Sequence, residues 1–310
     1  MLHNKHEAAK LVKRVHVCDD ASRIAIRRAA ARRWREMGDL TPEPGTPEPG
    51  DQPGDHSVDH SGDQPERPPS RRERARAATI EEIKQTALGL MREHGTTDFR
   101  FSDIARLMGM TAPALYRYFA DRDELLTALI VDAYDDLGRA VADARDQVPL
   151  DDPGGRFTAV AHSYRRWARE EPERFALILG LPVPGYHAPE EGPTTEAARR
   201  AMAQLKSLFY EASQAGVLRP PMLSDDGTIA GLLAEHHAGK MESPIDGPPV
   251  PPETFQAMLH CWASMHGFTS LDAYGHLDWM PDVLRDAVFE SSIRMVAKVA
   301  GLPEPRPRDG

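Results

Sequence analysis

The sequence has few of the features that identify several common classes of protein. It contains two cysteines in 310 residues, Cys18 and Cys261, which lie far apart and in different contexts. It therefore predicts neither a disulfide framework nor a cysteine metal site. No apolar run approaches the roughly 18 residues that a membrane helix needs, and the charged N-terminus lacks the apolar segment of a signal peptide. We expect a cytoplasmic protein with no membrane partner.

Motifs of catalytic and phosphate-binding sites are missing as well. The sequence has no His-Glu-x-x-His, no Cys-x-x-Cys, no serine nucleophile elbow and no phosphate loop. His236 and His237 are adjacent, and neighbours on a helix point about 100° apart, so they cannot both face one ion. We predict no enzyme activity, no metal and no cofactor.

Acidic charge dominates the chain, but it is unevenly placed. The net charge is −10, yet residues 71–122 hold ten basic and seven acidic side chains, whereas residues 123–310 hold seventeen and twenty-nine. The positively charged residues 71–122 also contain the most distinctive local sequence pattern of the chain, at residues 102–119. This asymmetry favours a localised phosphate-binding surface on an otherwise acidic protein.

Residues 102–119 are predicted to form two short helices with a tight turn between them. In the first helix, Ile104, Ala105 and Met108 share one face. Gly109 follows and suits the left-handed turn that ends a helix. An ordinary pair of core helices would give the same pattern if it stood alone.

The second of these helices has a start signal and an exposed tip. Thr111 offers a side-chain oxygen as a cap, and Pro113 falls in the first turn, where a missing N–H costs nothing. Leu115 and Phe119 lie four apart and are expected to face inward. The tip Tyr-Arg-Tyr at 116–118 then points elsewhere. A helix, a glycine turn and a short helix with such a tip are typical of a DNA-binding helix-turn-helix.

The neighbouring segments support this interpretation. An amphipathic helix is predicted before it over residues 77–94, and Asp121 caps another helix with the run DRDELL at 121–126. Residues 75–130 resemble the N-terminal domain of TetR/AcrR-type transcriptional regulators. The matching features are the Ile104-Ala105 pair, Gly109, the run ALYRYF at 114–119 and the acidic-Leu-Leu helix start.

The resemblance implies a set of DNA contacts. The start of the second short helix is expected to approach base edges. Tyr116 and Tyr118 are expected to contact phosphates or thymine methyls, and Arg117 is expected to contact a guanine. The arginine run at 71–76 is expected to be an arm that reaches phosphates or the minor groove, or else a solvated charge run. The predicted DNA-binding residues are Arg71, Arg72, Arg74, Arg76, Ser102, Thr111, Ala112, Pro113, Ala114, Tyr116, Arg117 and Tyr118.

The sequence departs from the family pattern at one position. A capping Thr or Ser is common two residues before Ser102, and here that residue is Arg100. Either Ser102 or Asp98 caps the helix instead, or the helix begins elsewhere.

Residues 1–70 lie outside the resemblance. A small basic helical pattern near residues 21–37 is expected to be largely disordered, although an extra nucleic-acid contact or a later translation start is an alternative. Residues 39–70 are expected to be an extended linker, because the stretch from Thr41 to Ser70 is rich in proline and glycine and holds only one sizeable apolar side chain, Val58.

The chain beyond residue 121 is predicted to be helical throughout. Expected helices cover residues 122–146, 154–170, 172–181, 195–215, 225–240, 252–271 and 281–300. Trp262, His266 and Gly267 resemble the signature of the WHG-type C-terminal domain of these regulators. We expect Gly267 to permit close helix approach and the trio to serve packing. In the family, the last two long helices pair with those of a second copy, so a homodimer is implied.

The resemblance also implies a small-molecule effector of unknown identity. Candidate ligand-binding residues are Tyr164, Trp167, Phe175, Phe209, His236, Trp262 and His266, although aromatic side chains at this spacing are more often core.

The sequence thus predicts an all-α fold in four parts. These are an extension and linker (1–70), a helix-turn-helix domain (71–121), a helical effector and dimerisation domain (122–303) and a disordered tail (304–310). The implied function is a ligand-responsive homodimeric repressor that binds a palindromic site in double-stranded DNA. The alternative is a helical protein-interaction module with a vestigial helix-turn-helix.

Overall fold

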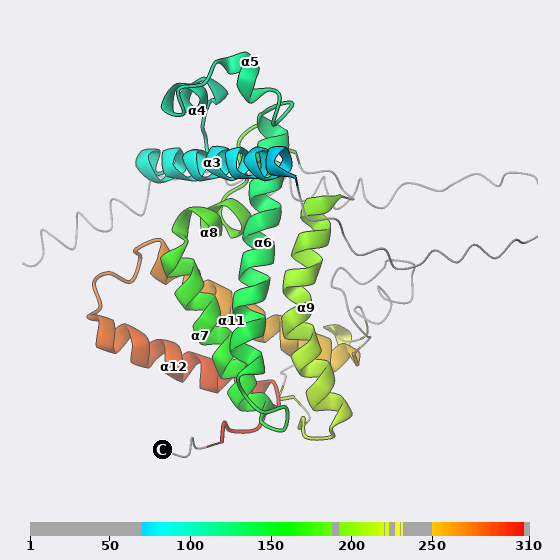
Figure 1. Ribbon diagram of the computed structural model, residues 1–310. Helices are drawn as coiled ribbons and strands as arrows, with labels where there is room; N and C mark the ends of the chain where they lie inside the picture. Colours follow the sequence, from blue (N-terminus) through cyan, green and yellow to red (C-terminus); the bar gives the residue numbers. More distant parts are fainter. Residues whose placement is uncertain are drawn as a thin grey trace, which may run out of the picture. The chain divides into compact units, whose positions relative to one another are not determined.

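The computed structural model describes residues 70–187, 192–219, 221–222, 227–229, 231 and 250–306. Within these residues the secondary structure is helical and contains no strand, which confirms the predicted all-α fold (Figure 1). The linker, the predicted helix at 225–240 and His236 lie almost wholly outside the described residues. The helices are α3 (Arg71–His94), α4 (Phe101–Leu107), α5 (Ala112–Leu115), α6 (Arg122–Asp146), α7 (Pro153–Glu170), α8 (Pro172–Leu179), α9 (Pro193–Gln214), α11 (Pro252–Ala273) and α12 (Asp282–Val299).

The first described helix, α3, begins six residues earlier than predicted. Ser70 caps it: its hydroxyl accepts from the backbone N–H of Glu73, whose carboxylate accepts in turn from the N–H of Ser70. This reciprocal capping box satisfies two free donors at the helix start. The expectation of an arm at 71–76 was therefore wrong, because these arginines form the first turns of a helix.

The long helix α6 has the predicted bounds, and Asp121 caps it as expected by accepting from the N–H of Glu124 at 2.8 Å. The helices predicted after α6 within the described residues begin and end within two residues of their expected positions. The helix α5 is shorter than predicted, because it ends at Leu115 and does not reach Phe119. Figure 1 shows α6 running from the helix-turn-helix along the remaining helices.

Buried side chains form two apolar clusters, one at each end of α6. The first, called here the head core, joins α3, α4, α5 and the start of α6, and its fully buried members include Ile83, Ile104, Leu115, Leu125 and Leu126. The second, called here the effector core, joins α7, α8, α9, α11, α12 and the end of α6, and includes Phe157, Phe175, Phe209, Met258 and Phe289.

The short helix α8 contributes to both cores. Phe175 is fully buried in the effector core, whereas Leu177 and the following loop residue Val183 are buried in the head core. The phenol of Tyr134 on α6 donates to the carbonyl of Ile178 at 3.1 Å and fixes α8 against α6. A change in the packing of Phe175 therefore acts directly on a helix that is part of the head core.

Buried arginines hold the helices of the effector core together. Arg165 on α7 donates to Asp272 at 2.6 Å and to Asp286 at 2.8 Å, and its guanidinium lies over the ring of Phe289 at 4.7 Å. Arg285 on α12 also pairs with Asp272, at 3.2 Å. Because a buried charge is costly unless paired, this network fixes α7, α11 and α12 in one arrangement.

The stretch after α12 crosses the start of α7. The backbone N–H of Arg306 donates to Asp152, the cap of α7, at 3.2 Å. The carbonyl of Pro303 occupies the space that a Cβ atom would need at Gly154. The absence of a side chain at Gly154 therefore admits this close approach.

Replacing Gly154 by alanine should lower the free energy of unfolding by about 1–3 kcal/mol, because the added methyl group meets backbone that cannot move freely. Chemical denaturation monitored by circular dichroism measures the change. Gly89→Ala is the matched control, since Gly89 lies exposed within α3 and no described atom comes within 4 Å of the position that a Cβ atom would take. That control should raise stability by about 0.5–1 kcal/mol. Equal effects of the two substitutions would contradict the close approach.

Candidate DNA-binding surface and effector-domain site

The helix-turn-helix forms with the predicted turn. Gly109 adopts a φ of 63° directly after α4, a conformation that favours glycine because it lacks a Cβ atom. Ile104 and Ala105 of α4 are buried, as are Leu115 and Phe119 on the following segment. The inward face expected from the sequence is therefore confirmed.

Neither helix of the pair has the side-chain cap that the sequence suggested. Arg100 stands at the N-cap of α4 without a capping bond. Ser102 is exposed inside the helix, and Asp98 pairs instead with Arg122 at 2.9 Å. Thr111 occupies the N-cap of α5, but its side chain makes no capping bond, so that expectation was wrong. A free hydroxyl at Thr111 remains available to another partner.

The tip that follows α5 is only partly exposed. Tyr116 is 53% exposed, and its ring packs against Phe101 with centroids 5.3 Å apart. Arg117 is exposed. Tyr118 is half-buried against the head core, so the expectation that all three side chains point away was wrong for this residue. The contact between Phe101 and Tyr116 had no signal in the sequence.

Arg76 supports the tip directly. Its guanidinium lies 5.1 Å from the ring centroid of Tyr118 and donates to the carbonyl of Arg117 at 3.1 Å. A cation above an aromatic face is attracted by the ring's quadrupole. Arg76 therefore connects α3, the first helix of the domain called here the head (residues 71–121), to residues 112–118, called here the recognition segment. The sequence did not reveal this role.

The remaining predicted contacts lie at the surface of the head. Thr111, Ala112 and Pro113 are exposed and Ala114 is half-buried at the start of α5. Three more predicted residues are exposed on the first turns of α3, namely Arg71, Arg72 and Arg74. The head thus presents polar tips and cations on one small domain.

Two ion pairs connect the head to the helices beyond it. Lys84 on α3 pairs with Asp132 on α6 at 2.6 Å. Arg92 near the end of α3 donates to Glu173 on α8 through two nitrogens, at 2.8 and 3.1 Å. Burial is the largest single influence and raises the pKa of Glu173, but the hydrogen bond from Arg92, the backbone N–H of Glu173 and the positive charge of Arg92 together outweigh it, so the pKa lies below its ordinary value. Glu173 is therefore ionised at neutral pH.

Four of the predicted ligand-binding residues come together in the effector core. Tyr164 and His266 are joined by a hydrogen bond of 2.8 Å between the phenol oxygen and Nδ1. The His266 ring stacks on Trp262 with centroids 5.3 Å apart, and it lies 5.9 Å from Phe175. Burial lowers the pKa of His266 and raises that of Tyr164, so both groups are neutral at pH 7.

The other candidates are placed differently. The indole N–H of Trp167 donates to Asp136 on α6 at 2.9 Å, and Phe209 is fully buried on α9. His236 is outside the described residues. The buried indole nitrogen of Trp262 has no hydrogen-bond partner among the described residues. Gly267 is exposed, and no described atom lies within 4 Å of the position that a Cβ atom would take there, so no described helix approaches it closely.

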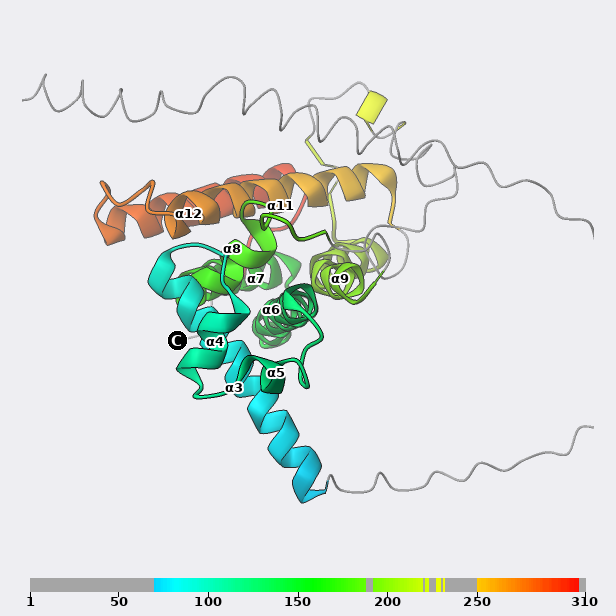
Figure 2. The same cartoon turned by 90° about the horizontal axis from the view of Figure 1, so that it is seen from above.

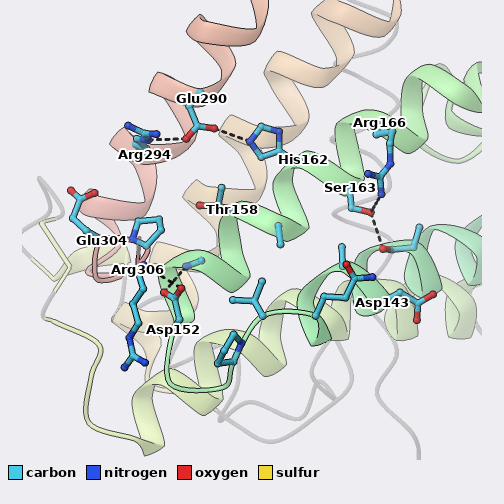
Figure 3. A pocket seen from close by; sticks show the side chains of 18 residues that line it. Asp143, Asp152, Thr158, His162, Ser163, Arg166, Glu290, Arg294, Glu304 and Arg306 are labelled. Carbon is cyan, nitrogen blue, oxygen red and sulfur yellow. Dashed lines mark hydrogen bonds and ion pairs between the residues drawn. The ribbon is translucent and has the colours of Figure 1, made fainter. Parts of the chain in front are cut away.

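A polar hollow of about 1330 Å³ lies between the end of α6, α7, α12 and the stretch at 304–306. Figure 3 shows Glu290 on α12 between His162 and Arg294, and both contact its carboxylate at 2.7 Å. None of the predicted ligand-binding residues lines this hollow. Because the Glu290 carboxylate is already paired with His162 and Arg294 and no predicted ligand-binding residue lies in the lining, we assign no ligand to this hollow.

The described residues offer no group of three or more His, Cys, Asp or Glu side chains that could hold a metal ion. Cys261 is buried, and burial raises the pKa of its thiol. No helix in the described part of the chain combines the length and apolar character needed to cross a bilayer.

Known proteins share both halves of this arrangement. The family profile described as "Bacterial regulatory proteins, tetR family" matches residues 83–129, which contain the helix-turn-helix. The profile described as "Tetracyclin repressor-like, C-terminal domain" matches residues 157–296, which contain Trp262, His266 and Gly267.

Individual relatives agree with these profiles. An HTH-type transcriptional regulator of Mycobacterium bovis is 34% identical over 231 residues, which cover 74% of this chain and 93% of the relative. A regulator of the same description from Mycobacterium tuberculosis H37Rv has the same identity and coverage. The crystal structure of a regulatory protein, SCO4313, matches with a TM-score of 0.59 and 31% identity, over 74% of this chain and all of that chain. The helix-turn-helix, the helical second domain and these relatives together establish that the chain belongs to the TetR family of bacterial transcriptional regulators.

Proposed function

We propose that the protein is a ligand-responsive homodimeric repressor that binds a palindromic operator. The observation that carries the DNA-binding part is the recognition segment: the exposed face of α5 and its tip are braced from behind by Phe101 and Arg76. Bracing fixes the direction of Tyr116 and Arg117 before DNA arrives, which lowers the entropic cost of binding.

In this proposal the contacts divide by position. The start of α5, with Ser102 and Thr111 beside it, approaches base edges and phosphates, and Arg117 is the candidate for guanine. Tyr116 contacts a phosphate or a thymine methyl. Arg76 and Tyr118 act mainly by holding the segment in place, and the phosphate contact from the arginine run before Arg76 is made from a helix rather than from an arm.

Replacing both Tyr116 and Arg117 by alanine should weaken specific binding at least about 100-fold, because each lost base or phosphate contact costs about 1–3 kcal/mol. Fluorescence anisotropy with a duplex selected by the protein from random-sequence DNA measures the affinity. Arg169→Ala, an exposed arginine on α7, is the control. Unchanged affinity of the double variant would favour a vestigial helix-turn-helix.

The arginines on α3 allow a sharper comparison. Arg72 lies four residues before Arg76 and so shares its face of the helix, whereas Arg74 points about 160° away from Arg76. We therefore assign the phosphate contact to Arg72. Arg72→Ala should reduce the slope of log K against log salt by about 0.9, the value expected for one lost phosphate contact. Arg74→Ala removes the same charge and should change the slope less. Equal slopes in the two variants would contradict the assignment.

The homodimer part rests on exposed apolar side chains of α11 and α12. Leu271 is 46% exposed, Leu284 48%, Met295 64% and Val283 83%. On α11, Ala263, Ser264 and Gly267 are exposed beside Leu271 at helical spacing. An exposed patch of this kind on a regulator is expected to be covered by a partner, and Figure 2 shows α11 and α12 side by side along one side of the described helices. Two-fold pairing of these helices presents two heads to a palindrome.

Gly267→Leu should weaken the dimer at least about tenfold while leaving the fold intact. Within the described part of one chain the new side chain meets open space, and leucine suits a helix better than glycine does, so a loss must come from the partner. Sedimentation equilibrium measures the dimer dissociation constant. Gly89→Leu, at another exposed helical glycine, is the matched control. A dimer that tolerates Gly267→Leu fully would contradict this interface.

The ligand-responsive part rests on the position of α8. Phe175 contacts His266 and Tyr164 in the effector core, and two residues later the same helix enters the head core through Leu177. A ligand that favours another packing of Phe175 would move α8 and, through it, the head. Regulation then follows as a shift between dimers whose heads match the operator and dimers whose heads do not.

A further inference from the structure

A second hollow lies where the head meets the effector domain. It is a groove of about 810 Å³ lined by the end of α3, by α8 with its following loop, and by the end of α11. Its volume falls in the range of ligand-binding pockets, roughly 300–1,000 Å³. Figure 1 shows α8 beside α3, and the last turn of α3 carries Met91 and Arg92 into the groove wall.

The groove combines an apolar surface with one fixed charge. Met91, Ala176 and Leu179 line it together with the ring of Tyr274, which is 44% exposed. The ion pair of Arg92 and Glu173 lies in the same wall. Its two side chains differ strongly in exposure: that of Glu173 is 11% exposed and that of Arg92 is 65% exposed.

This difference decides which partner a ligand can replace. Arg92 can leave the pair and be hydrated at little cost, since its side chain is already largely exposed to water. Glu173 cannot be hydrated as easily in the wall, and a buried carboxylate without a partner is strongly disfavoured. An anion that bound Arg92 would leave the Glu173 carboxylate without a cationic partner. A cation would instead replace Arg92 and keep the carboxylate paired. The acidic excess of residues 123–310 also attracts cations.

We propose that this groove binds an amphipathic organic cation. The ammonium group pairs with Glu173 in place of Arg92, the face of Tyr274 adds a cation–π contact, and the apolar body covers Met91, Ala176 and Leu179. Binding of the cation breaks the ion pair of Arg92 and Glu173 that connects α3 to α8. As a regulatory site it rests on the proposed function, but binding itself is measured without DNA.

The site is also connected to the rest of the effector domain. The Tyr274 ring lies 5.8 Å from that of Phe175, and Phe175 contacts the ring of His266, which stacks on Trp262. A cation on Tyr274 therefore touches the end of α11, the helix α8 and the end of α3 at once. These are the elements whose relative positions the proposed repressor must change.

The test is a calorimetric titration of the full chain with decyltrimethylammonium below its micellar concentration, with decyl sulfate as the anionic counterpart. We expect saturable binding of the cation, one per chain, and much weaker binding of the anion. Glu173→Gln should weaken binding of the cation about tenfold. Arg92→Gln should tighten it about fivefold, because no pair has to be broken. Glu170→Gln removes the same charge outside the groove and should leave binding unchanged.

The opposite pattern, with tighter binding in Glu173→Gln and weaker binding in Arg92→Gln, would overturn the cation in favour of an acid. Binding that ignores both substitutions, or no binding at all, would overturn the site. Ala176→Phe fills the groove without changing charge and should abolish binding, so the test stands even if Glu173→Gln fails to fold in a thermal-unfolding control. Anisotropy with DNA and no cation tests the proposed function separately.

Discussion

The structure depends on a helix of eight residues that belongs to two cores. Phe175 of α8 is packed among the aromatic side chains of the effector domain, and Leu177 of the same helix is packed in the head. Glu173 adds an ion pair to α3. Because close-packed cores resist continuous deformation, α8 cannot follow one core without disturbing the other. The position of the head is therefore set by the packing of the effector domain.

The direction of the recognition segment depends equally on the side chains that pack behind it. The helix α5 has only four residues, too few to be stable alone, and it has no side-chain cap. Its direction comes from the burial of Leu115 and Phe119 and from the contacts of Phe101 and Arg76. The positive charge of residues 71–122 and the negative charge of residues 123–310 confine the electrostatic attraction of DNA to the head.

Local chemistry made much of this arrangement predictable. Apolar periodicity predicted the extent of α6, the carboxylate of Asp121 predicted its cap, and the lack of a side chain at Gly109 predicted the turn, because each depends on neighbours in sequence. The capping box of Ser70 and Glu73 was present in the sequence, but the arginine run between and after them was interpreted as an arm. Contacts between distant segments could not be predicted from the sequence. Arg76 donates a hydrogen bond to Arg117, 41 positions later, and Leu177 of the effector domain is buried in the head core. Tyr118 is half-buried for the same reason. The DNA contacts and ligand-binding residues stay predictions.

In the proposed dimer, two such heads are held by the effector domains and bind one DNA site together. Sequencing the duplexes that the purified protein retains from a random-sequence pool tests this arrangement. We predict an inverted repeat whose half-site centres lie on one side of the duplex, about 34 Å or a multiple of it apart. Retained duplexes without a shared motif, or with a single unrepeated half-site, would contradict it.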